Sequence, residues 1–347
     1  MNGPDGKWIG WGIDDTDPKV TEFRKFMARK FASYAGDLGD SPVYDQQLAD
    51  AVSEMQTRYG LPATGIINWA TQVKMGFIKP AAPTERPIMF TVEGHLSDMW
   101  RGPVADTATQ LEAEGHCWHQ PIGYNNGAIP FDNDSGTREL ARLVGATVMD
   151  NGRPFPAGTP WSLGTFSQGG IVGFDFYTRY LQPGQPLAWR ATDLVGVLAY
   201  GNPCRQTNSV ASWALGEASP DGTHGLDPYR RFGLPGLPAR PAHPWADVWR
   251  NGDIFAQNTD DKSGDVKAAV YQAVARGDLF SDPYSLAAQI ADLFSVGFDE
   301  VVGIVMAIIS GAGFLAQQPN PHYAPYDISG GVNWMQDRLT AAAALRA

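Results

Sequence analysis

A serine at the end of an apolar stretch gives the clearest chemical signal in this sequence. Ser167 lies within the run Thr165-Phe166-Ser167-Gln168-Gly169-Gly170. The apolar residues 159–164 before it are typical of a buried strand, and residues 171–177 after it are typical of a helix. A sharp strand-to-helix turn presents the serine hydroxyl for nucleophilic attack, and small neighbours let the helix pack against the strand. Position 165 is usually glycine in such a turn, and this chain has threonine there.

The order of residues along the chain supplies the partners that a serine nucleophile requires. A serine hydroxyl is a weak nucleophile unless a histidine accepts its proton and an acidic side chain orients that histidine. With this kind of turn, the order along the chain is serine, acid and histidine. Three of the six histidines follow Ser167, namely His224, His243 and His322. The base is therefore expected among these three.

Asp253 and His322 fit this order. Asp253 lies in a Gly-Asp loop, Asn251-Gly252-Asp253-Ile254-Phe255, that follows a tryptophan-rich segment. His322 is the one histidine downstream of that loop, and Pro319 and Pro321 before it keep the backbone out of a helix. We therefore predict that Ser167, Asp253 and His322 form a catalytic triad. The alternatives for the acid are Asp247, Asp260 and Asp261.

Acyl transfer also requires hydrogen-bond donors for the oxyanion that forms on attack. One donor in sites of this kind is the main-chain amide of the residue after the nucleophile, here Gln168. The second donor comes from the loop after the first strand, which we expect to be Glu93-Gly94-His95-Leu96. The amide of His95 or of Leu96 would serve, and the sequence leaves this choice open. The His95 side chain is equally consistent with having no direct role.

The elements that would position these residues alternate between strands and helices. The predicted strands are residues 88–92, 118–124, 161–166 and 193–200. The predicted helices are residues 104–114, 138–151 and 333–345, with further helices within 264–317. Such alternation predicts an α/β fold with a central parallel sheet that helices cover on both faces. Residues 206–320 are expected to carry long loop and helical insertions.

The first 80 residues have a different pattern, typical of a small all-α domain. Apolar residues at helical spacing predict three helices, at 20–34, 44–59 and 69–75, and Asp45 can cap the second. The stretch 45–67, with Gln56, Gly60-Leu61 and Gly65-Ile66, resembles the peptidoglycan-binding three-helix module. This resemblance implies that residues 1–80 bind peptidoglycan; the alternative is a helical domain with no ligand. The Pro/Ala-rich residues 81–87 are expected to link this domain to a catalytic domain at 88–347.

The larger part of the chain resembles the lysin B family of mycobacteriophages. The residues that carry the resemblance are Phe166-Ser167-Gln168-Gly169, Gly201-Asn202-Pro203, Gly252-Asp253-Ile254 and His322-Tyr323. The resemblance implies a cutinase-like α/β-hydrolase fold. It also implies a phage lysis enzyme that hydrolyses the ester between mycolic acids and arabinogalactan in the mycobacterial cell wall. The alternatives are a general cutinase or lipase and an inactive wall-binding protein.

Composition narrows the classes of partner. A formal net charge of −11 argues against binding to nucleic acid or to an anionic membrane surface. Two cysteines, Cys117 and Cys204, cannot form a disulfide framework, and we expect both to be buried thiols. His116 and His119 lack the spacing of a strong metal motif, so no metal and no cofactor is expected. The first residues show no signal-peptide pattern and no apolar run is long enough for a transmembrane segment. We therefore expect synthesis in the host cytoplasm and action at the wall after release during lysis.

Overall fold

The computed structural model describes residues 9–78, 86–239, 243–276, 283–309 and 321–344. The chain divides into two compact units. The first contains Met1–Ala82 with the short segments Pro156–Gly158 and Tyr180–Thr192, and the second contains the remainder. Most of the predicted linker at 81–87 lies outside the described residues.

The amino-terminal part of the first unit is helical, as predicted. Its helices are α1 (Pro18–Lys30), α2 (Ala32–Ala35), α3 (Gln46–Arg58) and α4 (Trp69–Met75). The predicted helix at 20–34 is interrupted because Phe31 leaves the helical backbone region, at φ −126° and ψ 28°. The Asp45 carboxylate caps α3 by accepting the Leu48 amide at 2.9 Å. Phe23, Met27 and Val52 belong to a buried core formed entirely within this helical part.

The second unit is built on a five-stranded sheet in which all neighbouring strands are parallel. The strand order is β2-β1-β3-β4-β6. The strands are β1 (Ile88–Val92), β2 (Trp118–Pro121), β3 (Trp161–Phe166), β4 (Leu194–Tyr200) and β6 (Trp245–Val248). A separate antiparallel pair joins β5 (Thr223–His224) to β7 (Asn258–Thr259). Because parallel strands end at the same edge, the loops after β1, β3, β4 and β6 converge there.

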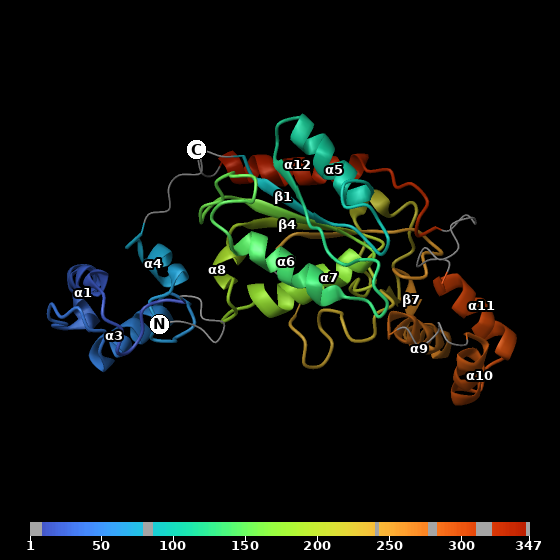
Figure 1. Ribbon diagram of the computed structural model, residues 1–347, viewed down its shortest axis with the longest axis horizontal. Helices are drawn as coiled ribbons and strands as arrows, with labels where there is room; N and C mark the ends of the chain where they lie inside the picture. The colour runs from blue at the N-terminus through green and yellow to red at the C-terminus, as the bar shows by residue number, and fades with distance from the viewer. Residues whose placement is uncertain (1–8, 79–85, 240–242, 277–282, 310–320, 345–347) are drawn as a thin grey trace. The chain divides into compact units, whose positions relative to one another are not determined.

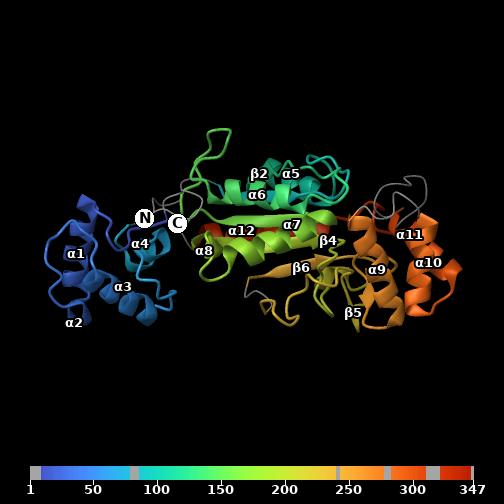
Figure 2. The same cartoon turned by 60° about the horizontal axis from the view of Figure 1, so that its bottom comes forward.

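Helices cover both faces of this sheet, which confirms the predicted α/β class. Figures 1 and 2 show α5 (Pro103–Ala113) and α12 (Ser329–Ala344) on one face, with α6 (Asn133–Gly145) and α7 (Gln168–Phe176) on the other. A cluster of three further helices lies beyond the end of the sheet, drawn in orange in Figure 1. The cluster consists of α9 (Lys262–Arg276), α10 (Pro283–Phe294) and α11 (Phe298–Ile309). The short elements are α8 (Ala188–Ala191), η1 (Tyr177–Leu181) and η2 (Ser212–Ala214).

Several element boundaries differ from the predictions. The helix predicted at 138–151 begins at Asn133, where Asp132 caps it by accepting the Ser135 amide, and it ends at Gly145. The final helix begins at Ser329 rather than at residue 333. Strand β6 was not predicted, since only four residues follow a long Pro/Gly-rich loop. Within the described ranges, no helix combines the length and apolar character needed to cross a membrane.

Candidate active site

Ser167 lies at a strained turn between β3 and α7. Its backbone has φ 54° and ψ −121°, a conformation with positive φ that is costly for a residue other than glycine. The Ser167 amide donates to the Tyr200 carbonyl at 3.1 Å, and the Ser167 carbonyl accepts the Gly170 amide at 2.8 Å. The turn therefore fixes the serine at the carboxyl edge of the sheet, between the end of β3 and the start of α7.

The glycines after Ser167 are required by close backbone contacts. A Cβ atom on Gly169 would lie 2.0 Å from the Val92 carbonyl oxygen, and one on Gly170 would lie 2.5 Å from Asn202 Oδ1. The unusual Thr165 is accommodated from the helix side: a Cβ atom on Gly173 would lie 2.8 Å from the Thr165 methyl group. Gly173 thus leaves room for the threonine, and the helix still packs against the strand.

Ser167, His322 and Asp253 lie in one hydrogen-bonded line. His322 Nε2 is 2.8 Å from Ser167 Oγ, and His322 Nδ1 is 2.9 Å from Asp253 Oδ1. In the tautomer with a proton on Nδ1, the ring donates to Asp253 and accepts from the serine hydroxyl. His322 and Asp253 are fully buried, whereas Ser167 retains 5% exposure. Solvent therefore reaches this line from the serine end.

The ring of His322 lies against aromatic rings and a glycine. The Phe166 ring stacks on it with a centroid distance of 5.1 Å, and the Phe255 ring lies 4.5 Å away. Gly201 has φ 50°, and a Cβ atom there would be 2.7 Å from His322 Cε1. The motif Gly201-Asn202-Pro203 therefore has a steric role, because only a glycine leaves room for the imidazole.

Asp253 is ionised within the protein interior. Burial by itself raises the pKa of its carboxyl group, but the adjacent His322 and the amides of Phe255 and Ala256 lower it below the ordinary value. Those amides donate to Oδ1 at 3.0 and 3.3 Å, and the Tyr326 hydroxyl donates to Oδ2 at 3.3 Å. The carboxylate is thus held in an orientation that fixes the Nδ1–H tautomer of His322.

The alternative acids and histidines are engaged elsewhere. Asp247 accepts from Asn202 Nδ2 at 2.9 Å and from the Ser209 hydroxyl at 2.6 Å. Asp260 pairs with His224 Nε2 at 3.0 Å, and Asp261 accepts the Gly264 amide in the first turn of α9. The remaining downstream histidine, His243, contacts the Tyr177 hydroxyl at 3.1 Å. None of these contacts places an acid or a ring beside Ser167.

Arg250 supports the His322 loop and was not identified in the sequence. Its guanidinium group donates to the carbonyls of Pro321, Ala324 and Pro325 at 3.0, 2.8 and 2.6 Å. It also lies 3.9 Å from the centre of the Tyr326 ring. The contacts join the loop that carries the histidine to the segment that carries Asp253. No spacing or motif marks this arginine, because its partners are backbone carbonyls about 70 residues away.

The candidate oxyanion donors flank Ser167. Gln168 is the first residue of α7, where main-chain amides have no partner inside the helix. The loop after β1 passes directly beside the serine, since a Cβ atom on Gly94 would lie 2.7 Å from Ser167 Cβ. The Leu96 amide already donates to the Asn126 carbonyl at 3.2 Å, and its side chain is 55% exposed. Leu96 would have to give up this bond to serve as the second donor.

The His95 side chain is buried and neutral. Its ring lies 4.8 Å from the Phe131 ring, centroid to centroid. Burial lowers the pKa of His95, while hydrogen bonds with Asn126 and Gln168 act in the opposite direction. The ring therefore anchors the loop beside the first turn of α7.

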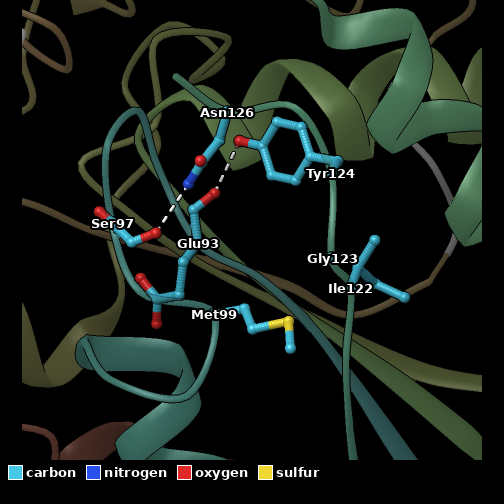
Figure 3. Close-up of a pocket in the computed structure, with 7 residues that line it drawn as sticks. All are labelled: Glu93, Ser97, Met99, Ile122, Gly123, Tyr124 and Asn126. Atoms are coloured by element: carbon cyan, nitrogen blue, oxygen red, sulfur yellow. Dashed lines mark hydrogen bonds between the residues drawn. The ribbon is translucent and has the colours of Figure 1, made fainter. Parts of the chain in front are cut away.

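A small cavity of about 200 Å³ lies behind this loop. Figure 3 shows its lining, which combines acidic, amide and hydroxyl groups with two apolar side chains. The lining residues are Glu93, Ser97, Met99, Ile122, Gly123, Tyr124 and Asn126. Long acyl chains are too large for this volume, so the cavity is suited to water or a small polar group.

The other candidate groups are structural. Cys117 and Cys204 are both free and buried, and burial raises the pKa of Cys117 to about 12. His119 Nε2 contacts the Thr91 hydroxyl at 2.7 Å, and burial lowers the pKa of its ring to about 4. In the part of the chain that the structure describes, no group of three His, Cys, Asp or Glu side chains is arranged to hold a metal ion.

Comparisons with known proteins assign the fold of each part. Residues 28–75 match the family model of a putative peptidoglycan binding domain. The crystal structure of lysin B from mycobacteriophage D29 is similar, with a TM-score of 0.55 and 24% identity over 73% of this chain and all of that one. A cutinase-like protein from Cryptococcus sp. (TM-score 0.36, 16% identity, 52% of this chain and 82% of that one) also matches. The catalytic core domain of acetyl xylan esterase from Trichoderma reesei matches with a TM-score of 0.34 and 15% identity, over 56% of this chain and 96% of that one. No curated protein matches by sequence.

Proposed function

We propose that this chain is a serine esterase that hydrolyses the ester between mycolic acids and arabinogalactan in the mycobacterial cell wall. The observation that carries the esterase assignment is the hydrogen-bonded line from Ser167 Oγ through His322 to the buried Asp253 carboxylate. The strained serine turn at the carboxyl edge of a parallel sheet supports it. The specific substrate rests on the likeness to lysin B from mycobacteriophage D29.

In the proposed reaction, Ser167 Oγ attacks the ester carbonyl carbon while His322 Nε2 accepts its proton. The amides of Gln168 and His95 stabilise the negative charge on the carbonyl oxygen. Collapse of this intermediate breaks the bond to the alcohol oxygen, which takes the proton from His322. Water then attacks the acyl-enzyme with His322 again as base, and releases the free acid and Ser167. Asp253 stabilises the charged imidazole throughout.

We also propose that the helical module binds peptidoglycan and so concentrates the enzyme at an insoluble substrate. The match of residues 28–75 to the putative peptidoglycan binding domain supports this role. Tethering raises the effective concentration of the catalytic domain near its ester without any new contact at the active site. The protein would be made in the host cytoplasm and reach the wall when the cell is lysed.

The test compares two substrates with one control variant. Purified protein is incubated with delipidated mycobacterial wall and, separately, with a short nitrophenyl ester, and free mycolic acid and nitrophenol are measured. We expect both products from the native chain and neither from Ser167→Ala. Nitrophenol without mycolic acid would indicate a general cutinase or lipase. The absence of both products from a folded native chain would contradict the esterase assignment.

A further inference from the structure

Glu93 is a buried acid at the base of the loop that passes Ser167. It follows β1 directly, and its side chain is 1% exposed. The next residue, Gly94, lies against the serine side chain. A Cβ atom on Gly169 of α7 would be 3.2 Å from the Glu93 carbonyl oxygen. Movement of Glu93 would therefore be transmitted to both sides of the candidate oxyanion hole.

The Glu93 carboxyl group ties the two ends of the 94–102 loop together. Its Oε1 accepts the Ala105 amide, in the first turn of α5, at 2.9 Å. The residue before that helix, Gly102, offers no side-chain cap, so Glu93 supplies one from β1. A Cβ atom on Gly102 would lie only 2.5 Å from Glu93 Oε2. The loop is thus closed at its base by a carboxyl group that a side chain at residue 102 would displace.

Two residues after β2 complete the attachment of this loop. The Tyr124 hydroxyl donates to the Glu93 carbonyl at 2.8 Å. The Asn126 side-chain amide donates to the carbonyls of Gly94 and Ser97 at 2.8 and 2.7 Å. Figure 3 shows these side chains around the cavity that Glu93 lines. The cavity gives water a place beside the carboxyl group.

The surroundings of Glu93 disfavour its charge. Oε2 has no hydrogen-bond partner among the residues that the structure describes. The charged side chains that face it, Asp98 on the loop and Asp106 on α5, are both acidic, and the facing Tyr124 is a neutral phenol. Burial raises the pKa of Glu93 to about 8; hydrogen bonds from the Ala105 and Val104 amides oppose this shift, and the two acids assist it. At neutral pH the carboxyl group therefore carries a proton.

We propose that Glu93 is a positioning residue for the oxyanion hole: its uncharged carboxyl group holds the 94–102 loop beside Ser167, and its ionisation lowers turnover. This inference rests on the proposed esterase function. A carboxylate at this place would be drawn towards water in the cavity, because a buried unpaired charge is costly. Its negative charge would also oppose the charge that develops on the substrate oxygen.

The pH dependence of kcat/KM for a short nitrophenyl ester tests the proposal. A serine–histidine pair gives a rate that rises as the histidine loses its proton and then reaches a plateau. For the native chain we expect a further fall above about pH 8, approaching tenfold for each pH unit. Glu93→Gln keeps the shape and an acceptor for the Ala105 amide but cannot ionise. Its rate should stay on the plateau up to pH 10.

Two further variants separate this effect from a purely structural one. Glu114→Gln removes an exposed acid at the other end of α5 and should keep the native alkaline fall. Asp106→Asn removes a charge that raises the Glu93 pKa, so it should move the fall to lower pH; this holds even if Glu93→Gln fails to fold. Circular dichroism at each pH, and recovery of activity on return to pH 7, exclude unfolding as the cause.

The outcomes are distinguishable. If kcat/KM falls in the same way at alkaline pH in the native chain and in Glu93→Gln, the proposed role of Glu93 is wrong. If Glu93→Gln does not fold, an alkaline fall at the same pH in Asp106→Asn as in the native chain would overturn the role instead. A native rate that stays flat to pH 10 would overturn it as well. Absence of ester hydrolysis at every pH, with no labelling of Ser167 by a fluorophosphonate, would instead contradict the proposed function.

Discussion

Among individual residues, His322 is the most tightly placed group of the candidate site. Its two ring nitrogens contact Ser167 and Asp253, and its faces lie against Phe166 and Phe255. The chain order and the proline-flanked loop predicted that these polar groups meet. The aromatic enclosure was not predictable, because the two phenylalanines come from segments about 90 residues apart. They contact the ring only because the sheet brings the ends of β3 and β6 to the same edge.

Replacement of Asp253 tests the orientation of the imidazole. We predict that Asp253→Asn lowers kcat/KM by roughly 10⁴-fold, since an amide no longer favours the Nδ1–H tautomer. Steady-state kinetics on a short ester measure this loss. Asp247→Asn is the matched control, because it breaks the contacts with Asn202 and Ser209. Its main effect should be a lower melting temperature rather than a lower kcat/KM. If Asp247→Asn lowered kcat/KM more than Asp253→Asn does, the assignment of Asp253 as the acid would be wrong.

Glu93 also predicts a pH-dependent stability. Its pKa is about 8 in the folded chain against 4.5 for the free side chain, so the folded state retains a proton that the unfolded state releases. Its contribution to stability is complete below about pH 4.5 and is lost as the pH rises through about 8. The difference corresponds to roughly 5 kcal/mol at most.

Denaturant unfolding of the native chain and Glu93→Gln at pH 4.5, 6.5 and 9 measures this effect. We expect the free energy of unfolding of Glu93→Gln, relative to the native chain, to increase from pH 4.5 to 9. The cost of burying the glutamine amide is the same at each pH and cancels in the comparison. A difference that does not change with pH would show that the folded and unfolded states hold the same charge at Glu93.

Between elements, the position of the site depends on contacts that have no local signal. Strands β1, β3 and β4 were predicted because each is a run of mostly apolar residues, whereas the four residues of β6 were missed. The turn after β3 illustrates the same limit. Thr165 departs from the usual glycine, and the compensating Gly173 is identified only once α7 is packed on the sheet.

Arg250 provides a test at this level. We predict that Arg250→Lys lowers kcat by roughly tenfold or more, because one ammonium group cannot reproduce the three hydrogen bonds that hold the His322 loop. Kinetics and thermal unfolding are measured together. Arg142→Lys, which alters an exposed pair with Glu139 and Asp150, is the control and should leave kcat near the native value. An equal effect of both substitutions would remove the positioning role of Arg250.

Across the whole molecule, the chain combines a helical module and an α/β domain, each with its own buried core. The module was predicted from a local pattern of amphipathic helices and turns, which is why its second and third predicted helices agree closely with α3 and α4. The domain was predicted from the alternation of strands and helices. The strand order could not be predicted, because it depends on pairings such as β1 with β3 that join segments about 70 residues apart.

Removal of residues 1–80 tests whether the helical module binds peptidoglycan while the rest of the chain hydrolyses esters. We predict that the shortened chain hydrolyses a short soluble ester at a rate within about twofold of native, but sediments much less with purified peptidoglycan. Ser167→Ala in the full chain is the control and should sediment normally without turnover. Equal sedimentation of the full and shortened chains would remove the anchoring role from the helical module.

Labelling with a fluorophosphonate tests the central claim most directly, because it requires an activated serine and no knowledge of the natural substrate. Mass spectrometry of the digested adduct is predicted to place the single modification on Ser167, with labelling of His322→Ala slower by several powers of ten. An unmodified folded chain, or an adduct on another residue, would contradict the assignment of Ser167 as the nucleophile.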